Sequence, residues 1–126
     1  MFETEAARLL EILREQGDIS PLLDLVSSTL EFREKAKPHV AKMLFNPLKE
    51  AGVAVFHSDL KPGDGVDLVG DVLDPAVRAA LRERGFKCML LANVLEHVRD
   101  CSAIMAACEE IVGPGGLIVA TVPSSH

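Results

Sequence analysis

Aromatic side chains and basic clusters are scarce in this sequence. It contains no Trp and no Tyr, so the flat rings on which single-stranded nucleic acids stack are nearly absent. Its 13 Lys and Arg residues are outnumbered by 19 Asp and Glu residues, which gives a formal net charge of −6. No run of basic residues could follow a phosphate backbone. These absences argue against nucleic acid as the partner.

Long apolar runs are absent too. The longest fall far short of the ~20 residues that a membrane-spanning helix requires. The N-terminal segment MFETEAARLLEILREQ is amphipathic and acidic, unlike a secretory signal or a transit peptide. We therefore expect a soluble, cytoplasmic protein with no membrane partner.

Cysteine and histidine are too few and too scattered to indicate a metal site. The three cysteines lie in apolar surroundings and show no Cys-x-x-Cys spacing, so we expect buried, reduced thiols that serve packing. A zinc site would need more ligands at regular spacing. The residues concerned are Cys88, Cys101, Cys108, His39, His57, His97 and His126.

Apolar residues, in contrast, are plentiful. They make up 48% of the 126 residues, which is enough to form the core of one ordinary domain. We find no internal repeat, linker or low-complexity segment. A single domain over residues 1–126 is therefore expected.

Helical and extended patterns alternate along the chain. Apolar residues recur at helical spacing in some segments and form short continuous runs in others. These patterns predict helices over residues 3–16, 31–51, 74–84 and about 100–112, and strands over residues 19–26, 53–57, 66–69, 87–92 and 117–122. Pro38 and Pro47 should break or kink the second helix. Asp74 should cap the third helix, and Asp100 or Ser102 the fourth.

Short strands that alternate with helices are typical of a parallel sheet covered on both faces. Right-handed crossovers then give an α/β fold, a Rossmann-like doubly wound, mainly parallel five-stranded sheet with helices on both faces. Ligands bind to such sheets outside the carboxyl ends of the strands. The segments that follow the five predicted strands are polar, and they read SST, SD, GD, NVLEH and PSS. We expect these segments to gather at one rim of the sheet.

Four stretches of the sequence, each made of one or two predicted strands with the residues around them, resemble in order and spacing the motifs of class I S-adenosylmethionine-dependent methyltransferases. LLDLVSST is similar to their first motif, an apolar strand that ends in Asp before a glycine-rich loop. VFHSDLKPGDGVDLVGDVLDP resembles their second and third strands, each followed by an acidic residue. LLANVLEHVRD resembles their fourth-strand motif, and IVGPGGLIVATVP their fifth. The resemblance covers about residues 19–123 and implies the strand order 3-2-1-4-5.

The resemblance implies S-adenosylmethionine as the cofactor and assigns a role to each matching residue. Asp59 would hold the ribose hydroxyls, and Asp71 with the backbone of Val72 would lie at the adenine edge. Asp24 would shape the loop after the first strand, and Asn93 would line the floor near the sulfonium. The backbone of three further residues would face the methionine part of the cofactor, namely Val26, Ser27 and Ser28.

Two features depart from the family pattern. Family members usually have glycine at the position of Val26, where the backbone turns tightly, and positive φ is a genuine outlier for a β-branched residue. They also usually continue beyond the equivalent of His126 with two more strands and much of the acceptor-binding surface. The sequence leaves open whether this chain is truncated, a gene fragment or a minimal family member.

Three hypotheses about function remain at this point. The first is a methyltransferase that acts on a small or unknown acceptor, with His97 either as a general base or as a residue that opens the helix after the fourth strand. The second is a catalytically inactive, methyltransferase-like domain with a binding or regulatory role. The third, a nicotinamide-dinucleotide domain, would require Gly-x-Gly-x-x-Gly after the first strand, and LVSSTL lacks it.

The fifth strand predicts a contact between molecules. Residues 117–122 read LIVATV, which is apolar at nearly every position. In the family a further strand pairs with its outer edge, and an exposed apolar edge invites pairing with another chain. We expect a homodimer or another partner at this strand, unless the helix of residues 3–16 covers the edge.

Overall fold

The computed structural model describes residues 3–25, 41–59, 62, 65–92 and 101–121. Five parallel strands form one sheet in the order β3-β2-β1-β4-β5. Their bounds are β1 (Leu22–Leu25), β2 (Val55–Asp59), β3 (Leu68–Val69), β4 (Cys88–Ala92) and β5 (Leu117–Thr121). The expected Rossmann-like α/β fold and its strand order are confirmed.

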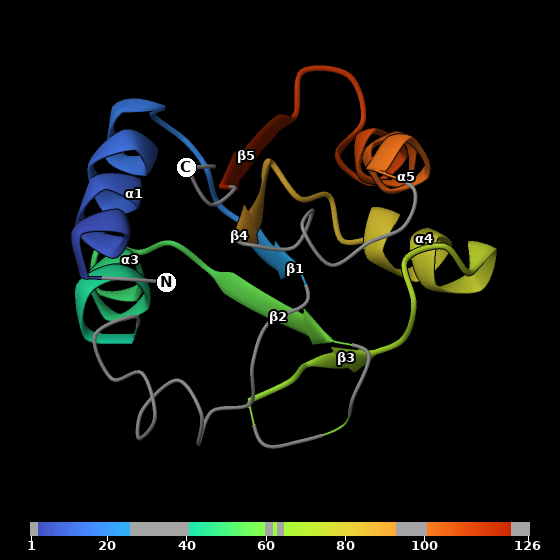
Figure 1. The fold of residues 1–126 in the computed structure, drawn as a ribbon, viewed down its shortest axis with the longest axis horizontal. Helices are drawn as coiled ribbons and strands as arrows, with labels where there is room; N and C mark the ends of the chain where they lie inside the picture. The colour runs from blue at the N-terminus through green and yellow to red at the C-terminus, as the bar shows by residue number, and fades with distance from the viewer. Residues whose placement is uncertain (1–2, 26–40, 60–61, 63–64, 93–100, 122–126) are drawn as a thin grey trace, which may run out of the picture.

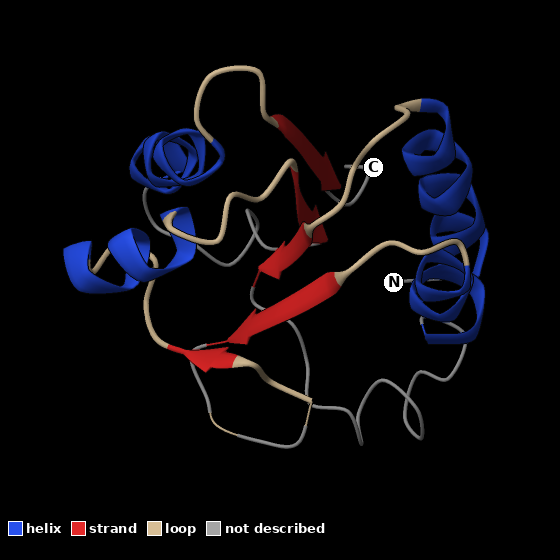
Figure 2. Ribbon diagram, turned by 180° about the vertical axis from the view of Figure 1, so that it is seen from behind, coloured by secondary structure: helices blue, strands red, loops and turns tan. Residues whose placement is uncertain are grey.

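Helices cover both faces of this sheet. Figure 1 shows α1 (Glu3–Glu15) and α3 (Asn46–Glu50) on one side and α4 (Pro75–Arg82) and α5 (Cys101–Val112) on the other. The view from behind gives the same division into three layers (Figure 2). The carboxyl ends of all five strands therefore lie at one rim, because the strands are parallel.

The central strands β1 and β4 carry mostly apolar side chains on both faces, as expected for strands between two helical layers. Leu23 and Leu25 of β1 point to the α4–α5 side, whereas Leu22 points to the α1–α3 side. In β4, Met89 and Leu91 alternate in the same way with Cys88 and Leu90. Successive side chains point to opposite faces, and both faces are covered by helices. The sequence of each strand therefore shows a continuous apolar run rather than an alternation of apolar and polar residues.

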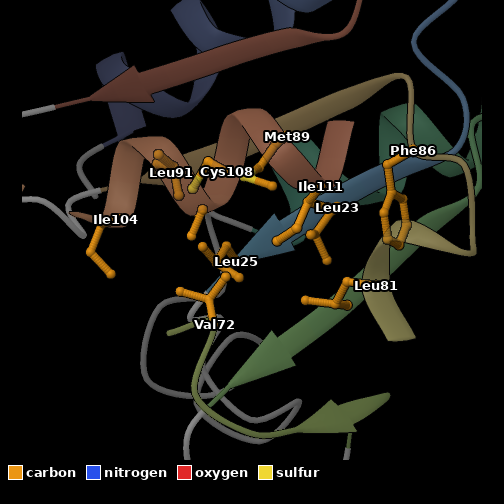
Figure 3. Packing of buried hydrophobic residues seen from close by; sticks show 11 residues of the cluster. Leu23, Leu25, Val72, Leu81, Phe86, Met89, Leu91, Ile104, Cys108 and Ile111 are labelled. Atoms are coloured by element: carbon orange, nitrogen blue, oxygen red, sulfur yellow. The ribbon is translucent and has the colours of Figure 1, made fainter. Parts of the chain in front are cut away.

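The core on the α4–α5 side is built from side chains of both helices and of β1 and β4 (Figure 3). Leu81 of α4 and Cys108 of α5 are fully buried, and α5 also contributes Ile104 and Ile111. Val72, which follows β3, reaches into the same cluster. Fully burying one such side chain stabilises the fold by roughly 1.5–3 kcal/mol.

The core on the α1–α3 side begins with the first helix. Leu9 and Leu13 lie on one side of α1, as the spacing predicts, and they pack with Leu44 and Leu48. The helix ends at Glu15, just before Gly17, whose φ is +80°. This positive φ is one that glycine adopts without strain.

The predicted break in the second helix appears at its second proline. One turn of π-helix, η2 (Ala41–Phe45), leads directly into α3, and Pro47 lies in the first turn of α3. Proline is tolerated there because the first amide nitrogens of a helix have no partner within it. Pro38 lies outside the described residues.

Helix α4 begins as the sequence predicts. The side chain of Asp74 accepts a hydrogen bond from the amide of Ala76 at 2.9 Å, with Pro75 at the first helical position. Helix α5 already includes Ser102, so that residue does not cap it, and Asp100 lies outside the described residues.

The second strand lies two residues further along the chain than predicted. The amide of Val53 donates to the carbonyl of Leu48, so Val53 belongs to the turn that ends α3. β2 therefore runs from Val55 to Asp59, and Asp59 is its last residue rather than part of the following loop.

Candidate functional site

The rim of the sheet brings two of the expected acidic residues close together. Asp59 ends β2 and lies in register with Val69 of the neighbouring strand β3. The amide of Gly70 donates to the carbonyl of Asp59 at 2.9 Å, which ties the end of β2 to the start of the next loop. Asp71 follows Gly70 directly and is exposed. The carboxylates expected for ribose and adenine recognition thus come from adjacent strand ends.

The loop between β3 and α4 contains two hydrogen bonds of its own. Asp71 accepts the amide of Leu73 at its carboxylate oxygen Oδ1 and the amide of Asp74 at its backbone carbonyl, both at 2.9 Å. Val72 is 5% exposed and anchors the loop in the core, whereas Leu73 is 45% exposed. The loop therefore has one anchored residue and one apolar side chain that faces solvent.

Gly70 holds this loop against α4. A Cβ atom at Gly70 would lie 2.6 Å from Cγ2 of Val77, closer than carbon atoms approach one another. Any side chain at this position would push the loop and the helix apart. Glycine is thus required here by close approach rather than by an unusual φ.

Asp24 has a different environment from the other candidate residues. It is 5% exposed, and its Oδ2 lies 2.8 Å from Nδ1 of His57, which is 3% exposed. The two side chains thus share one buried hydrogen bond. The other ring nitrogen, Nε2, is buried and has no hydrogen-bond partner among the residues that the structure describes.

The rest of the His57 environment holds the ring in place. The ring of Phe45 meets it edge-on, with a centroid distance of 5.0 Å and an interplanar angle of 83°. The backbone of His57 is fixed as well, because its amide donates to Oδ2 of Asp67 at 2.8 Å and its carbonyl accepts from the amide of Asp67 at 2.7 Å. The Asp24–His57 pair therefore ties β1 to β2 within the core.

The structure thus divides the predicted site residues into three groups. Asp59, Asp71 and Val72 lie together at the rim formed by β2 and β3. Asp24 lies near the carboxyl end of β1 but is buried against His57. The remaining candidates lie outside the described residues, and they are Val26, Ser27, Ser28, Asn93 and His97.

Sequence reasoning missed two residues near this site. His57 was seen only as one of four scattered histidines, although the strand order 3-2-1 makes the strand of Asp24 and the strand of His57 neighbours. Arg78 was not singled out at all. Its Nη1 donates to the carbonyls of Val72 and Leu73 at 3.3 and 2.9 Å. The only sequence feature that could have indicated Arg78 is its position four residues after the helix cap Asp74, and this feature is weak evidence for a contact with the loop.

Two of the cysteines are packing residues, as expected. Cys88 and Cys108 are free, fully buried thiols that lie on opposite faces of the sheet. Burial raises the pKa of each thiol to about 11, and the charge of Glu109 adds to the effect at Cys108. Neither thiol is suited to act as a nucleophile near neutral pH.

The part of the chain that the structure describes contains no group of three or more His, Cys, Asp or Glu side chains that could hold a metal ion. None of its helices has the length and apolar character needed to cross a membrane.

No protein-family model and no curated protein sequence matches this chain.

Proposed function

We propose that this protein is an S-adenosylmethionine-dependent methyltransferase with a small or unknown acceptor. The observation that carries the proposal is the rim where Asp59 ends β2 beside the loop of Asp71 and Val72, joined to it by the Gly70–Asp59 hydrogen bond of 2.9 Å. The four sequence motifs in the order of the sheet support the same assignment.

The groups at this rim suit the nucleoside part of the cofactor. Carboxylates after the strands of such sheets accept hydrogen bonds from ribose hydroxyls, which is the role proposed for Asp59. An acidic side chain next to a backbone amide, as at Asp71 and Val72, can accept and donate at the edge of a purine. Leu73, exposed beside them, offers an apolar surface for a base.

The cofactor, when bound, would supply a methyl group on a positively charged sulfur. The protein would contribute binding, orientation of the two reactants and exclusion of water, which together can supply much of the rate enhancement. Asn93 would line the floor of the site. His97 could remove a proton from the acceptor, although a good nucleophile needs no such base.

A second candidate function is an inactive, methyltransferase-like domain with a binding or regulatory role. The contact of Asp24 with His57 favours it, because this carboxylate is engaged inside the core rather than at the rim. Val26, where the family usually has glycine, favours it too. In this case cofactor binding would persist without methyl transfer.

The test of cofactor binding is a calorimetric titration with S-adenosylhomocysteine. A hydrogen bond to a charged group contributes roughly 1.5–3 kcal/mol, so Asp59→Ala should weaken binding by about 10- to 150-fold. Asp18→Ala is the matched control, since Asp18 is an exposed carboxylate that pairs with Lys87 near the amino ends of the strands. Equal affinity of the Asp59→Ala variant and the parent would overturn the proposed site.

The test that separates the two candidate functions is a methyl-transfer assay with a panel of small nucleophiles. Turnover that depends on S-adenosylmethionine supports the enzyme, and binding without turnover supports the inactive domain. The variant Val26→Gly should raise cofactor affinity if the loop needs the tight turn of the family. Unchanged affinity in this variant would remove Val26 as an argument for inactivity.

A further inference from the structure

The guanidinium group of Arg78 joins three parts of the molecule. Its Nη1 donates to the carbonyl of Leu73 at 2.9 Å and to that of Val72 at 3.3 Å. Its Nε donates to Oε2 of Glu110 in α5 at 3.0 Å. The side chain of Arg78 is only 21% exposed, although it begins on the first turns of α4. Arg78 thus connects α4, α5 and the loop after β3.

These contacts decide which polar groups the loop can offer to a ligand. The carbonyls of Val72 and Leu73 are occupied by Arg78, and the carbonyl of Asp71 is occupied by the amide of Asp74. The amide of Val72 and the carboxylate oxygen Oδ2 of Asp71 make no hydrogen bond to a described residue. The loop is left with an adjacent donor and acceptor, while the two carbonyls beside them are turned toward the guanidinium of Arg78.

The geometry is one that only arginine can supply. A planar guanidinium has several N–H groups in a fixed fork, so one side chain can satisfy two carbonyls and a carboxylate at once. A lysine ammonium is a single point charge and cannot span the same three acceptors. Val72, buried in the middle of the loop, and Gly70 at its start, where a Cβ atom would meet Val77, leave little room for another conformation.

We propose that Arg78 is the positioning residue that sets the base specificity of the cofactor site. By occupying the two carbonyls, it fixes the loop so that the amide of Val72 donates and Asp71 accepts, a pattern that matches adenine and opposes hypoxanthine. Hypoxanthine presents an N–H where adenine has a bare ring nitrogen, and a carbonyl where adenine has an amino group. A site built to bond one pattern rejects the other, because its polar groups are then left unpaired.

This inference rests on the proposed function. Binding measurements with two ligands, one with adenine and one with hypoxanthine, test the inference and the proposed function separately. Affinities of S-adenosylhomocysteine and S-inosylhomocysteine are measured by calorimetry for the parent and for Arg78→Gln, Arg78→Lys and Glu110→Gln. Arg82→Gln is the matched control, because Arg82 is an exposed arginine of the same helix. Amide exchange of Leu73 and Asp74 without ligand reports whether the loop is held. Glu110 is half exposed, so its variant should fold even if those of Arg78 do not.

The parent should prefer the adenine compound by about tenfold or more, which corresponds to roughly one hydrogen bond. Arg78→Gln should bring the two affinities close to each other and speed exchange of the loop amides. Arg78→Lys and Glu110→Gln should give intermediate ratios, and Arg82→Gln the ratio of the parent.

Two results would overturn the inference, and they can be told apart. An unchanged ratio in Arg78→Gln, with faster loop exchange, would make Arg78 a purely structural residue and leave the proposed function standing. Failure of the parent to bind either compound would overturn the proposed function, and the inference with it.

Discussion

The two faces of the sheet have different kinds of core. On the α4–α5 face an apolar cluster with one cysteine thiol extends from Leu23 of β1 to Ile111 of α5, and the buried carboxylate and imidazole of the described residues do not lie on this face. On the α1–α3 face the apolar cluster lies beside a carboxylate and an imidazole, which are the buried pair Asp24–His57. The strands are shared, so the difference arises from alternate residues of the same two strands.

The comparison shows what each face contributes to the protein. An apolar cluster stabilises through area removed from water and does not depend on the protonation or pairing of any one group. A buried hydrogen-bonded pair roughly balances the desolvation of its two groups against their attraction, and the loss of either partner leaves the other buried without its hydrogen bond. On the α1–α3 face this pair therefore fixes the relative position of β1 and β2. A substitution of either partner alone should destabilise the protein.

The largest expected effect is the loss of one partner of the buried pair. His57→Leu should lower the free energy of unfolding by about 3–5 kcal/mol, because it leaves the carboxylate of Asp24 buried alone. The double variant Asp24→Val, His57→Leu should recover most of this loss, since two apolar residues replace the whole pair. Urea unfolding of the parent and both variants measures these differences.

The matched control lies on the other face of the same strand. Leu23→Ala should cost about 2–5 kcal/mol through lost burial and an unfilled cavity. No second substitution on β2 should restore the lost stability, because Leu23→Ala leaves no buried polar group without its partner. If His57→Leu costs less than about 1 kcal/mol, or if the double variant is no better than the single one, the two faces do not differ as described.

A smaller effect concerns the two buried thiols, which lie one on each face. The folded chain keeps each proton up to about pH 11, whereas the ordinary thiol pKa is 9.0. The unfolded chain loses these protons first, so the free energy of unfolding should fall as the pH rises from 9 towards 11. At pH 8 the thiolate fraction should be about 100-fold lower than for an exposed cysteine.

Reaction with a disulfide reagent checks this expectation in a Cys101→Ala background. Cys88 and Cys108 should both react slowly in the folded protein and rapidly in urea. Fast reaction of one thiol alone would show that its face of the sheet opens more readily than the other.

The smallest expected effect is at the edge of the sheet. The amide of Leu117 donates to the carbonyl of Lys87, so alternate residues of β5 face β4. By this alternation the amides of Ile118 and Ala120 face outward and should exchange faster than those of Leu117 and Val119. If two copies pair through this strand, exchange at the two outward amides should slow as protein concentration rises. A monomer at every concentration, with unchanged exchange, would reject this contact.

Much of the fold could be predicted from local patterns. Apolar runs bounded by glycine and proline located all five strands, and the Asp74-Pro75 pair located the start of α4. The boundaries were less certain, because they depend on contacts between segments. The strand predicted over 53–57 moved by two residues because Val53 bonds to Leu48, a contact that no periodicity reveals.

The candidate site was predictable only in part, and for the same reason. Asp59 and Asp71 could be found because each ends or follows a strand. The Asp24–His57 pair depends on the register of β1 against β2, which places these two residues opposite each other. The contacts of Arg78 join residues far apart in sequence, since Glu110 lies 32 positions away. Residue spacing within one segment carries no information about either arrangement.

The most direct measurement of the central claim is a map of ligand-induced shifts in backbone amide resonances. S-adenosylhomocysteine should shift the amides of Asp59 and of residues 70–73, which form the rim between β2 and β3. The amides of Asp18 and Lys87, near the amino ends of the strands, should not move. Shifts confined to the amino ends, or no shifts at millimolar ligand, would contradict a cofactor site at this rim.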